Sequence, residues 1–76
     1  MSYVVKPFPC FIDSFEFYKV IGGRKVYRNN DFYYSWDELH GEIEVFDRRG
    51  YHLGALHATS GEKIKKAVKG RRLNVQ

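Results

Sequence analysis

Cysteine and proline are scarce in this chain of 76 residues, and long hydrophobic runs are absent. Cys10 is the only cysteine, so no disulfide forms within the chain and no cysteine-based zinc site is available. A single thiol fits a protein that works in a reducing compartment. Pro7 and Pro9 break any regular element at the start. No apolar run approaches the roughly 18 residues that cross a membrane, so we expect a domain that makes no membrane contact.

Aromatic residues, by contrast, are plentiful at 17% of the chain. A chain this short buries only about 60% of its unfolded surface, so large rings are an efficient way to build its core. A hydrophobic share of 43% is too high for a disordered segment. We therefore expect one folded domain and a monomer, with residues 1–30 as a variable N-terminal part and residues 31–76 as the functional sheet and tail.

The net charge of +4 is unevenly distributed. Residues 63–76, which we call the basic tail, contain six basic residues and no acidic residue, whereas residues 1–62 contain seven basic and nine acidic residues. A basic tail on a slightly acidic body indicates a polyanionic partner, most simply nucleic acid. The alternative is a solvated tail that keeps the protein soluble.

The pattern along the chain predicts a mainly β (α+β) fold, a highly twisted antiparallel sheet with a short N-terminal helix. Residues 11–20 fit either a helical stripe or a strand, and Gly22-Gly23 ends that element. The strands that we expect after it are residues 24–28, 32–36, 41–46 and 51–57, with a possible short strand at 73–75. The turns between them are marked by Asn29-Asn30-Asp31 and by Arg48-Arg49-Gly50.

A three-residue loop at 48–50 sets the register of the last hairpin and thereby sorts its side chains. It places Phe46 opposite His52 and Glu44 opposite Gly54. The expected core face then carries Val45, Leu53, Ile43 and Ala55, and the other face carries His40, Glu42, Glu44, Phe46 and His52.

Two carboxylates and a histidine on one face supply a proton acceptor and a proton donor. Cleavage of RNA needs that combination, because a base removes the proton of the 2′-hydroxyl and an acid protonates the leaving 5′-oxygen. Cations from the basic tail would neutralise the charge on phosphorus. His40 and Glu44 nevertheless lie about 13 Å apart on an extended strand, so a bend is required, and Gly41 is the plausible place for it.

Other interpretations of these residues remain open. Alternating glutamates are common on a solvent-facing strand, and Trp36 is more often a core residue than a binding platform. A metal site would use His40, Glu44, His52 and His57, but these residues lack a standard ligand spacing. A non-catalytic RNA-binding β-module also explains the basic tail, although carboxylates repel phosphate.

Residues 34–46, Tyr-Ser-Trp-Asp-Glu-Leu-His-Gly-Glu-Ile-Glu-Val-Phe, resemble the cytotoxic domains of the ribosome-inactivating colicins and cloacin. Those domains carry a Tyr-x-Trp-Asp-x-x-His-Gly-Glu-Leu-Glu signature, and the resemblance continues through His52-Leu53-Gly54, Gly61, Lys65 and Arg71. It covers roughly residues 33–76. Toxins of contact-dependent inhibition systems have the same fold class.

The resemblance implies an endoribonuclease that cuts 16S ribosomal RNA at the decoding site of the 30S subunit. By position, Glu44 is similar to the general base, His40 to the general acid, Asp37 to the carboxylate that orients the histidine, and Arg71 to the stabilising cation. It further implies no metal, no cofactor and an acidic immunity protein or antitoxin as partner. The site of action would be the cytoplasm of a target bacterium.

Further side chains are expected to contact the RNA: Tyr34, Trp36, Glu42, Phe46, Lys63, Lys65 and Arg72. Phe46 stands where the colicins have a tyrosine, so it would keep the stacking and lose the hydroxyl. A third possibility is a toxin–antitoxin ribonuclease of another fold with a different RNA target.

Overall fold

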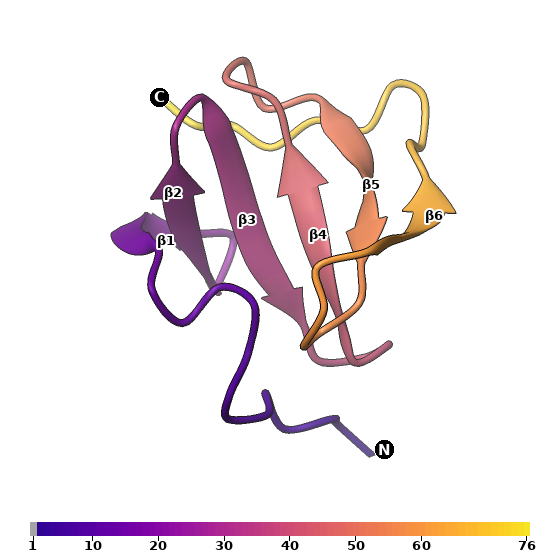
Figure 1. Ribbon diagram of the computed structural model, residues 1–76. Coiled ribbons are helices and arrows are strands. Elements are labelled where there is room, and N and C mark those ends of the chain that lie inside the picture. The colour runs from indigo at the N-terminus through magenta and orange to yellow at the C-terminus, as the bar shows by residue number, and fades with distance from the viewer. Residues whose placement is uncertain (1) are drawn as a thin grey trace.

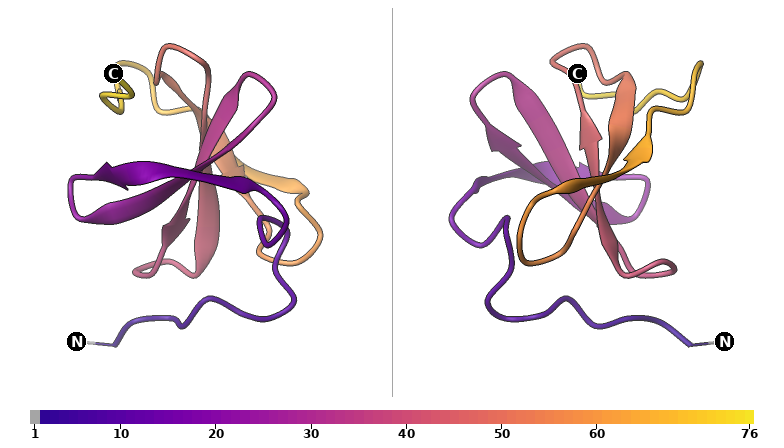
Figure 2. Two further views of the ribbon diagram at one scale, coloured as in Figure 1. Left: turned by 90° about the vertical axis from the view of Figure 1, so that its left-hand side faces the viewer. Right: turned by 45° about the vertical axis from the view of Figure 1, so that its right-hand side comes forward.

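The computed structural model describes residues 2–76 as a single antiparallel sheet in which consecutive strands are neighbours. Its six strands are β1 (Glu16–Ile21), β2 (Arg24–Asn29), β3 (Phe32–Asp37), β4 (Glu42–Phe46), β5 (His52–Leu56) and β6 (Lys63–Lys66). Figures 1 and 2 show a strong twist, because β1 and β2 lie across the direction of β4 and β5. No helix long and apolar enough to cross a membrane occurs among residues 2–76.

The tight turns follow from residues that tolerate positive φ. Asn30 has φ 57° between β2 and β3, and an asparagine adopts this left-handed conformation at lower cost than most residues. Gly50 has φ 90° in the turn between β4 and β5, as expected. A Cβ at Gly50 would also collide with the backbone oxygen of Leu73, so this position needs glycine for space as well as for conformation.

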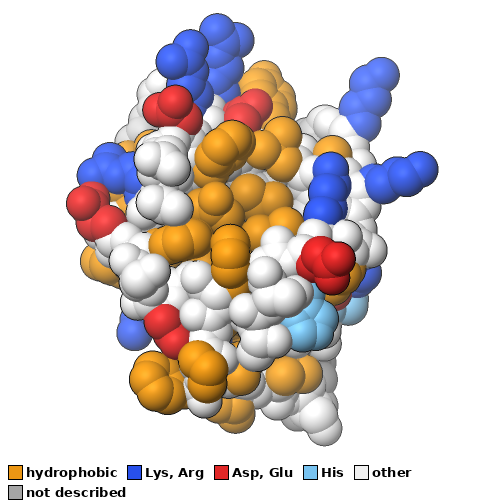
Figure 3. Space-filling view, viewed as in Figure 1, with side chains coloured by type: hydrophobic (Ala, Val, Ile, Leu, Met, Phe, Trp, Pro, Cys, Tyr) orange, Lys and Arg blue, Asp and Glu red, His pale blue; other side chains and the backbone are white. Residues whose placement is uncertain are grey.

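One face of the sheet carries the hydrophobic core. Its buried cluster consists of Cys10, Ile12, Tyr34, Ile43 and Val45, and residues 10–15 supply the cover from outside the sheet. Phe15 packs against Tyr34 with ring centroids 4.7 Å apart. Figure 3 shows this face with its hydrophobic centre and with basic side chains gathered along the upper and right edges.

The C-terminal segment, residues 67–76, crosses the other face. Backbone hydrogen bonds from His52 N to Arg71 O and from Leu73 N to Gly50 O attach it to β5 and to the preceding turn. At its end Val75 is buried, and the Tyr18 hydroxyl donates to the Val75 carbonyl oxygen. Figures 1 and 2 place this segment and residues 10–15 on opposite sides of the sheet.

The expected N-terminal helix is wrong. Residues 11–15 form turns, with Asp13 N donating to Cys10 O and Phe15 N to Ile12 O, and the chain then enters β1. The apolar stripe that suggested a helix is divided between the two faces, since Phe15 packs in the core and Tyr18 packs against Tyr33. Pairing with β2 supplies the backbone hydrogen bonds that a helix would otherwise have made.

The strands expected at 24–28, 32–36, 41–46 and 51–57 are confirmed within one or two residues at their ends. Residues 73–75, in contrast, form no strand, and the nearest pairing is an isolated bridge between Tyr51 and Arg72. β6 was not expected. β1 and β2 belong to the same sheet as the later strands, although both fall within residues 1–30.

The register between β4 and β5 is correct at Phe46 and His52 but shifts by one residue beyond them. A bulge inserts Leu53, so Val45 faces Gly54 and Glu44 faces Ala55. Leu53 and Leu56 therefore pack against the core, and Ala55 lies on the same face as Glu44. The expected glycine opposite Glu44 is wrong for this reason.

Candidate active site

Three carboxylates meet where β3 and β4 are joined. Asp37 pairs with Glu42, and Ser35 pairs with Glu44, so all four side chains lie on the face that the C-terminal segment crosses. Oxygen atoms of Asp37, Glu42 and Glu44 lie within 4.8 Å of one another, and all three residues are buried. Like charges at this distance repel, so the group persists only because cations and hydrogen bonds surround it.

A turn at residues 38–41 brings His40 back to this group. Gly41 N donates to Asp37 O over 2.8 Å, and Oδ1 of Asp37 accepts from the backbone N–H groups of Leu39 and His40. His40 Nδ1 lies 2.8 Å from Asp37 Oδ2, and because a carboxylate only accepts, Nδ1 carries the proton. The turn ends at Gly41, whose φ is 67°, and it places His40 beside Asp37 in the same hollow that Glu44 lines.

The N-terminal arm, residues 2–9, holds this turn from outside. Val4 N donates to Glu38 O over 2.7 Å, and the indole N–H of Trp36 donates to Val4 O over 3.0 Å. The Val4 side chain lies against Gly41, where a Cβ would approach it to 2.9 Å. The geometry of the Asp37–His40 pair therefore depends on residues far from it in the sequence.

Asp37 is stabilised as a carboxylate despite its burial. Burial raises the pKa of this carboxyl, but the hydrogen bonds from the His40 ring and from the backbone of His40 and Leu39 outweigh it, so the pKa lies below its ordinary value of 3.8. A charged Asp37 is the form that orients an imidazole through Nδ1–H and compensates its positive charge. Among residues 2–76, His40 Nε2 makes no hydrogen bond and remains available to a substrate.

Each carboxylate has its own cation. Nη2 of Arg71 lies 2.7 Å from Oε2 of Glu44. Nζ of Lys65 lies 3.1 Å from Oε1 of Glu42. Nη2 of Arg24 lies 3.8 Å from Oδ1 of Asp37. The three cations come from the C-terminal segment, β6 and β2. Residues distant in sequence therefore converge on one acidic centre. Arg71 and Lys65 were among the expected site residues, whereas Arg24 was not.

His52, on β5, contacts the Glu44 carboxylate. Its Nδ1 accepts the Val68 N–H over 2.8 Å, so in the neutral ring Nε2 carries the proton, and Nε2 lies 3.2 Å from Glu44 Oε2. Neither this contact nor that of Arg71 has the angles of a good hydrogen bond, and Glu44 Oε2 and His52 Nε2 are both buried without one. A buried acceptor with unused capacity is a group that can take a proton from a bound hydroxyl.

A hollow of about 160 Å³ is lined by both of the residues on which acid–base chemistry would depend. His40 stands at its rim with 60% of its side chain exposed, and Glu44 lies at its base with 5% exposed. Arg71, 43% exposed, covers the carboxylate. The arrangement places a proton donor and a proton acceptor around one opening, with a cation beside the acceptor.

Three aromatic residues expected at the site lie elsewhere. Tyr34 and Trp36 are on the core face, since Tyr34 belongs to the buried cluster and Trp36 packs against it. Phe46 is on the correct face but is only 3% exposed and packs against His52, so it offers no surface for stacking. Tyr34 and Phe46 are therefore not among the exposed side chains of this centre, and contact of the three rings with RNA stays a prediction.

The two remaining residues expected to contact RNA lie outside the hollow. Lys63 is exposed on β6. Arg72 lies over the ring of Tyr51 at 5.2 Å and donates from Nε to Arg49 O. Both are accessible to a long polyanion and neither contacts the carboxylates.

The three clustered carboxylates are the group of described residues whose spacing would suit a metal ion. Lysine and arginine already neutralise all three. The set considered from the sequence, His40, Glu44, His52 and His57, is not assembled among the described residues, because Nδ1 of His57 accepts hydrogen bonds from Thr59 and Ser60 in a separate turn. The geometry favours proton transfer at this centre.

The fold and the site together define a small basic β-protein with a histidine–carboxylate centre. A family model described as Cytotoxic matches residues 17–74, which is more than half of the chain. The chain therefore belongs to the Cytotoxic family, and this membership indicates a toxin domain. No curated protein and no solved structure matches it.

Proposed function

We propose that this domain is an endoribonuclease toxin that cleaves 16S ribosomal RNA by metal-independent acid–base catalysis. The observation that carries this proposal is that His40 and Glu44 line one hollow, in which Asp37 holds the His40 ring through Nδ1. The signature at residues 34–46 and membership in the Cytotoxic family support the same activity. The decoding site of the 30S subunit is the target that the colicin resemblance implies.

The reaction requires two proton transfers. Glu44 removes the proton of the 2′-hydroxyl, and the oxygen attacks the adjacent phosphorus. His40 acts as the imidazolium: its Nδ1–H stays on the Asp37 carboxylate, and its Nε2 gives a proton to the 5′-oxygen as the bond from that oxygen to phosphorus breaks. The products are a 2′,3′-cyclic phosphate and a free 5′-hydroxyl, so no water and no metal enters the step.

Arg71 has two roles in this scheme. In the free protein it covers Glu44, and in the complex its guanidinium turns to the phosphate, which exposes the carboxylate to the 2′-hydroxyl. A guanidinium matches two phosphate oxygens at once, which makes arginine suited to the charge that develops on phosphorus. Arg71 therefore exchanges the Glu44 carboxylate for the phosphate and remains paired with an anion throughout.

The remaining charges suit a ribosomal substrate and a protein inhibitor. The basic tail and Arg72 provide phosphate contacts along a polyanion, which strengthen binding without reading sequence. The same positive surface suits an acidic immunity or antitoxin protein. We propose that the monomer acts in the cytoplasm of a target bacterium.

Purified ribosomes, incubated with the protein, test this proposal. We expect one short 3′ fragment of 16S RNA that begins with a 5′-hydroxyl, and a long 5′ fragment that ends in a 2′,3′-cyclic phosphate. We expect cutting to continue in EDTA. His40→Ala and Glu44→Gln should each lower the rate by at least about 100-fold, as is typical for loss of a general acid or base. His57→Ala and Glu62→Gln are matched controls, because both residues are exposed and lie outside the hollow.

The alternatives give different results in this assay. Binding to ribosomes without any fragment would favour the non-catalytic RNA-binding module. Cutting of another RNA in preference to 16S RNA would indicate a toxin–antitoxin type of target. Unchanged cutting by folded His40→Ala and Glu44→Gln variants would overturn the mechanism.

A further inference from the structure

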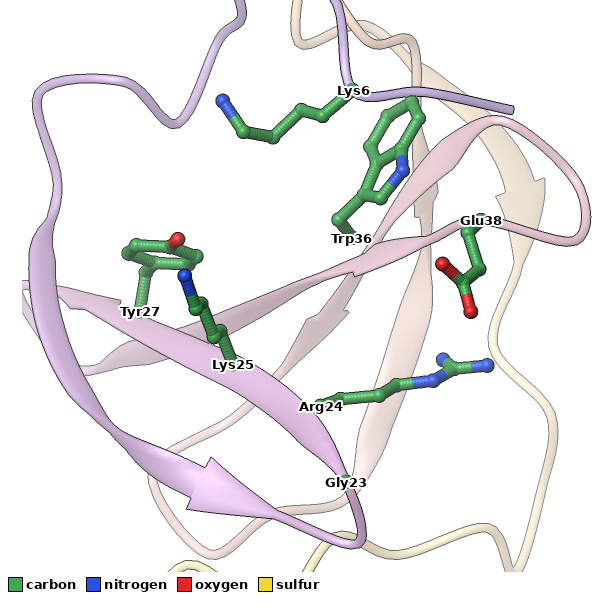
Figure 4. Close-up of a pocket in the computed structure, with 7 residues that line it drawn as sticks. All are labelled: Lys6, Gly23, Arg24, Lys25, Tyr27, Trp36 and Glu38. Atoms are coloured by element: carbon green, nitrogen blue, oxygen red, sulfur yellow. The ribbon is translucent and has the colours of Figure 1, made fainter. Parts of the chain in front are cut away.

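A second hollow, of about 260 Å³, lies on the other side of β3 from the carboxylates. We call it the tryptophan hollow, and Figure 4 shows the side chains around it: Lys6, Gly23, Arg24, Lys25, Tyr27, Trp36 and Glu38. Two aromatic rings and three cations face one opening with a single carboxylate. Both rings pack against the core on one side, and on the other side they face this opening.

The rings and one of the cations are held in place before any ligand arrives. Trp36 is fixed by the hydrogen bond from its indole N–H to Val4 O, and Tyr27 packs against the core. Lys6 is held at the opening by Asp13, 2.9 Å from its ammonium nitrogen. Fixed groups lose little conformational entropy on binding, so the hollow is organised to receive a ligand.

Lys25 supplies a cation that is not already neutralised. It is exposed on β2, and no carboxylate of residues 2–76 lies within 4.0 Å of its ammonium group. Figure 4 shows it reaching over the opening between Tyr27 and Arg24. An anionic group that enters here meets this charge directly.

The tryptophan hollow and the acid–base centre lie on the two faces of the end of β3, and Arg24 lies between them. Trp36 and Asp37 are consecutive residues and therefore point to opposite faces of the strand. Arg24 belongs to both places, because it lines the hollow and its guanidinium lies 3.8 Å from Asp37 Oδ1. A chain that passes the end of β3 contacts both.

We propose that the tryptophan hollow binds one nucleotide of single-stranded RNA that flanks the cleaved phosphodiester. The base stacks on Trp36, and its phosphate lies by Lys25 and Arg24. Stacking of unpaired bases on aromatic rings beside cations is the usual way in which single strands are held, and the small volume suits one nucleotide. This proposal rests on the proposed function for the identity of the ligand.

Trp36 is the only tryptophan of the chain, so its fluorescence reports on the hollow directly. The protein carrying His40→Ala, which cannot cleave, is titrated with a heptaribonucleotide of adenosine and uridine. We expect saturable quenching, weakened about tenfold by Lys25→Glu through loss of a phosphate contact and added repulsion. Arg48→Glu makes the same charge change in the exposed turn between β4 and β5, outside the hollow and the basic tail, and should weaken binding less than about threefold.

Polyglutamate serves as an anion without bases and should leave the fluorescence unchanged. Circular dichroism confirms that each variant is folded. Absence of quenching by the RNA, equal weakening by Lys25→Glu and Arg48→Glu, or equal quenching by polyglutamate would each overturn the proposal.

The two proposals fail in different ways. If the unsubstituted protein cuts no ribosomal RNA but the heptanucleotide still quenches Trp36, the ribonuclease is refuted and the nucleotide site is supported. If ribosomal RNA is cut while Trp36 is unaffected and Lys25→Glu cuts as well as the original chain, the ribonuclease is supported and the nucleotide site is refuted.

Discussion

Replacing Glu42 by glutamine should stabilise the fold. Glu42 is buried, and its oxygen lies within 4.8 Å of oxygens of Asp37 and Glu44. At an effective dielectric constant of about 20, two unit charges at that distance repel by about 3.5 kcal/mol, so the two neighbours together oppose folding by about 7 kcal/mol. Glutamine keeps the shape of the side chain and removes this repulsion.

Glu42→Gln loses the attraction to Lys65, which is smaller than the repulsion from Asp37 and Glu44 that it relieves. Lys65, the partner of Glu42, is 52% exposed, and an ion pair of that kind contributes at most about 1 kcal/mol. Cations beside Asp37 and Glu44 already cancel most of the repulsion in the original chain. We therefore expect a net gain of about 1–2 kcal/mol, which is the repulsion that remains after this cancellation less the lost attraction of Lys65.

Urea unfolding at neutral pH measures this gain. With a slope of about 1 kcal/mol per molar urea for a protein this small, the midpoint should rise by about 1–2 M. Glu62→Gln is the control, because Glu62 is exposed, and its effect should stay within about 0.5 kcal/mol. A lower midpoint for Glu42→Gln, or one equal to that of the control, would refute the view that the carboxylates repel one another in the folded state.

Two further results follow from the surroundings of Asp37 and Val75. Because the pKa of Asp37 is lowered on folding, its contribution to stability is present above its ordinary pKa of 3.8 and is lost as the pH falls through the lower folded value. The stability difference between the original chain and Asp37→Asn should therefore be larger at pH 7 than at pH 2; a constant difference in chemical denaturation would contradict this. Val75→Ala removes two buried carbons, about 1.5 kcal/mol at about 0.8 per carbon, and by loosening the C-terminal segment it should lower kcat for RNA cleavage. Asn74→Ala, an exposed neighbour, should leave kcat unchanged, and equal loss in both would exclude a positioning role for Val75.

The strands from β2 to β5 could be predicted because local pattern and tertiary structure agree there. β-rich runs end at Asn30 and Gly50, where positive φ is required. The stripe of Phe11, Ile12 and Phe15 misled us, since its spacing satisfies both a turn over the core and a helix. β6 carries one apolar residue, Ile64, and forms because β5 offers an unpaired edge, which no local pattern can reveal.

The signature at residues 34–46 predicted which residues form the acid–base centre more accurately than the expected pairing of β4 with β5 did. Asp37, His40 and Glu44 do come together, but through a turn and not through a bent strand. The bulge at Leu53 has no signal in the sequence, so the pairing of Glu44 could not be foreseen. The position of Tyr34 and Trp36 could have been foreseen. Side chains alternate along a strand, so both residues lie on the face of β3 opposite to that of Asp37.

A single sheet without a second layer has little interior in which to build a site, and this explains why the proposed active site is held by segments near both ends of the chain. Val4 in the N-terminal arm braces the turn that carries His40, and Val75 near the other end of the chain anchors the segment that carries Arg71. The core, in contrast, depends on Ile43 and its neighbours at the centre of the sheet. Substitutions at the two ends should therefore reduce cleavage while the sheet persists, whereas substitutions at the centre should unfold the protein before they reveal anything about its chemistry.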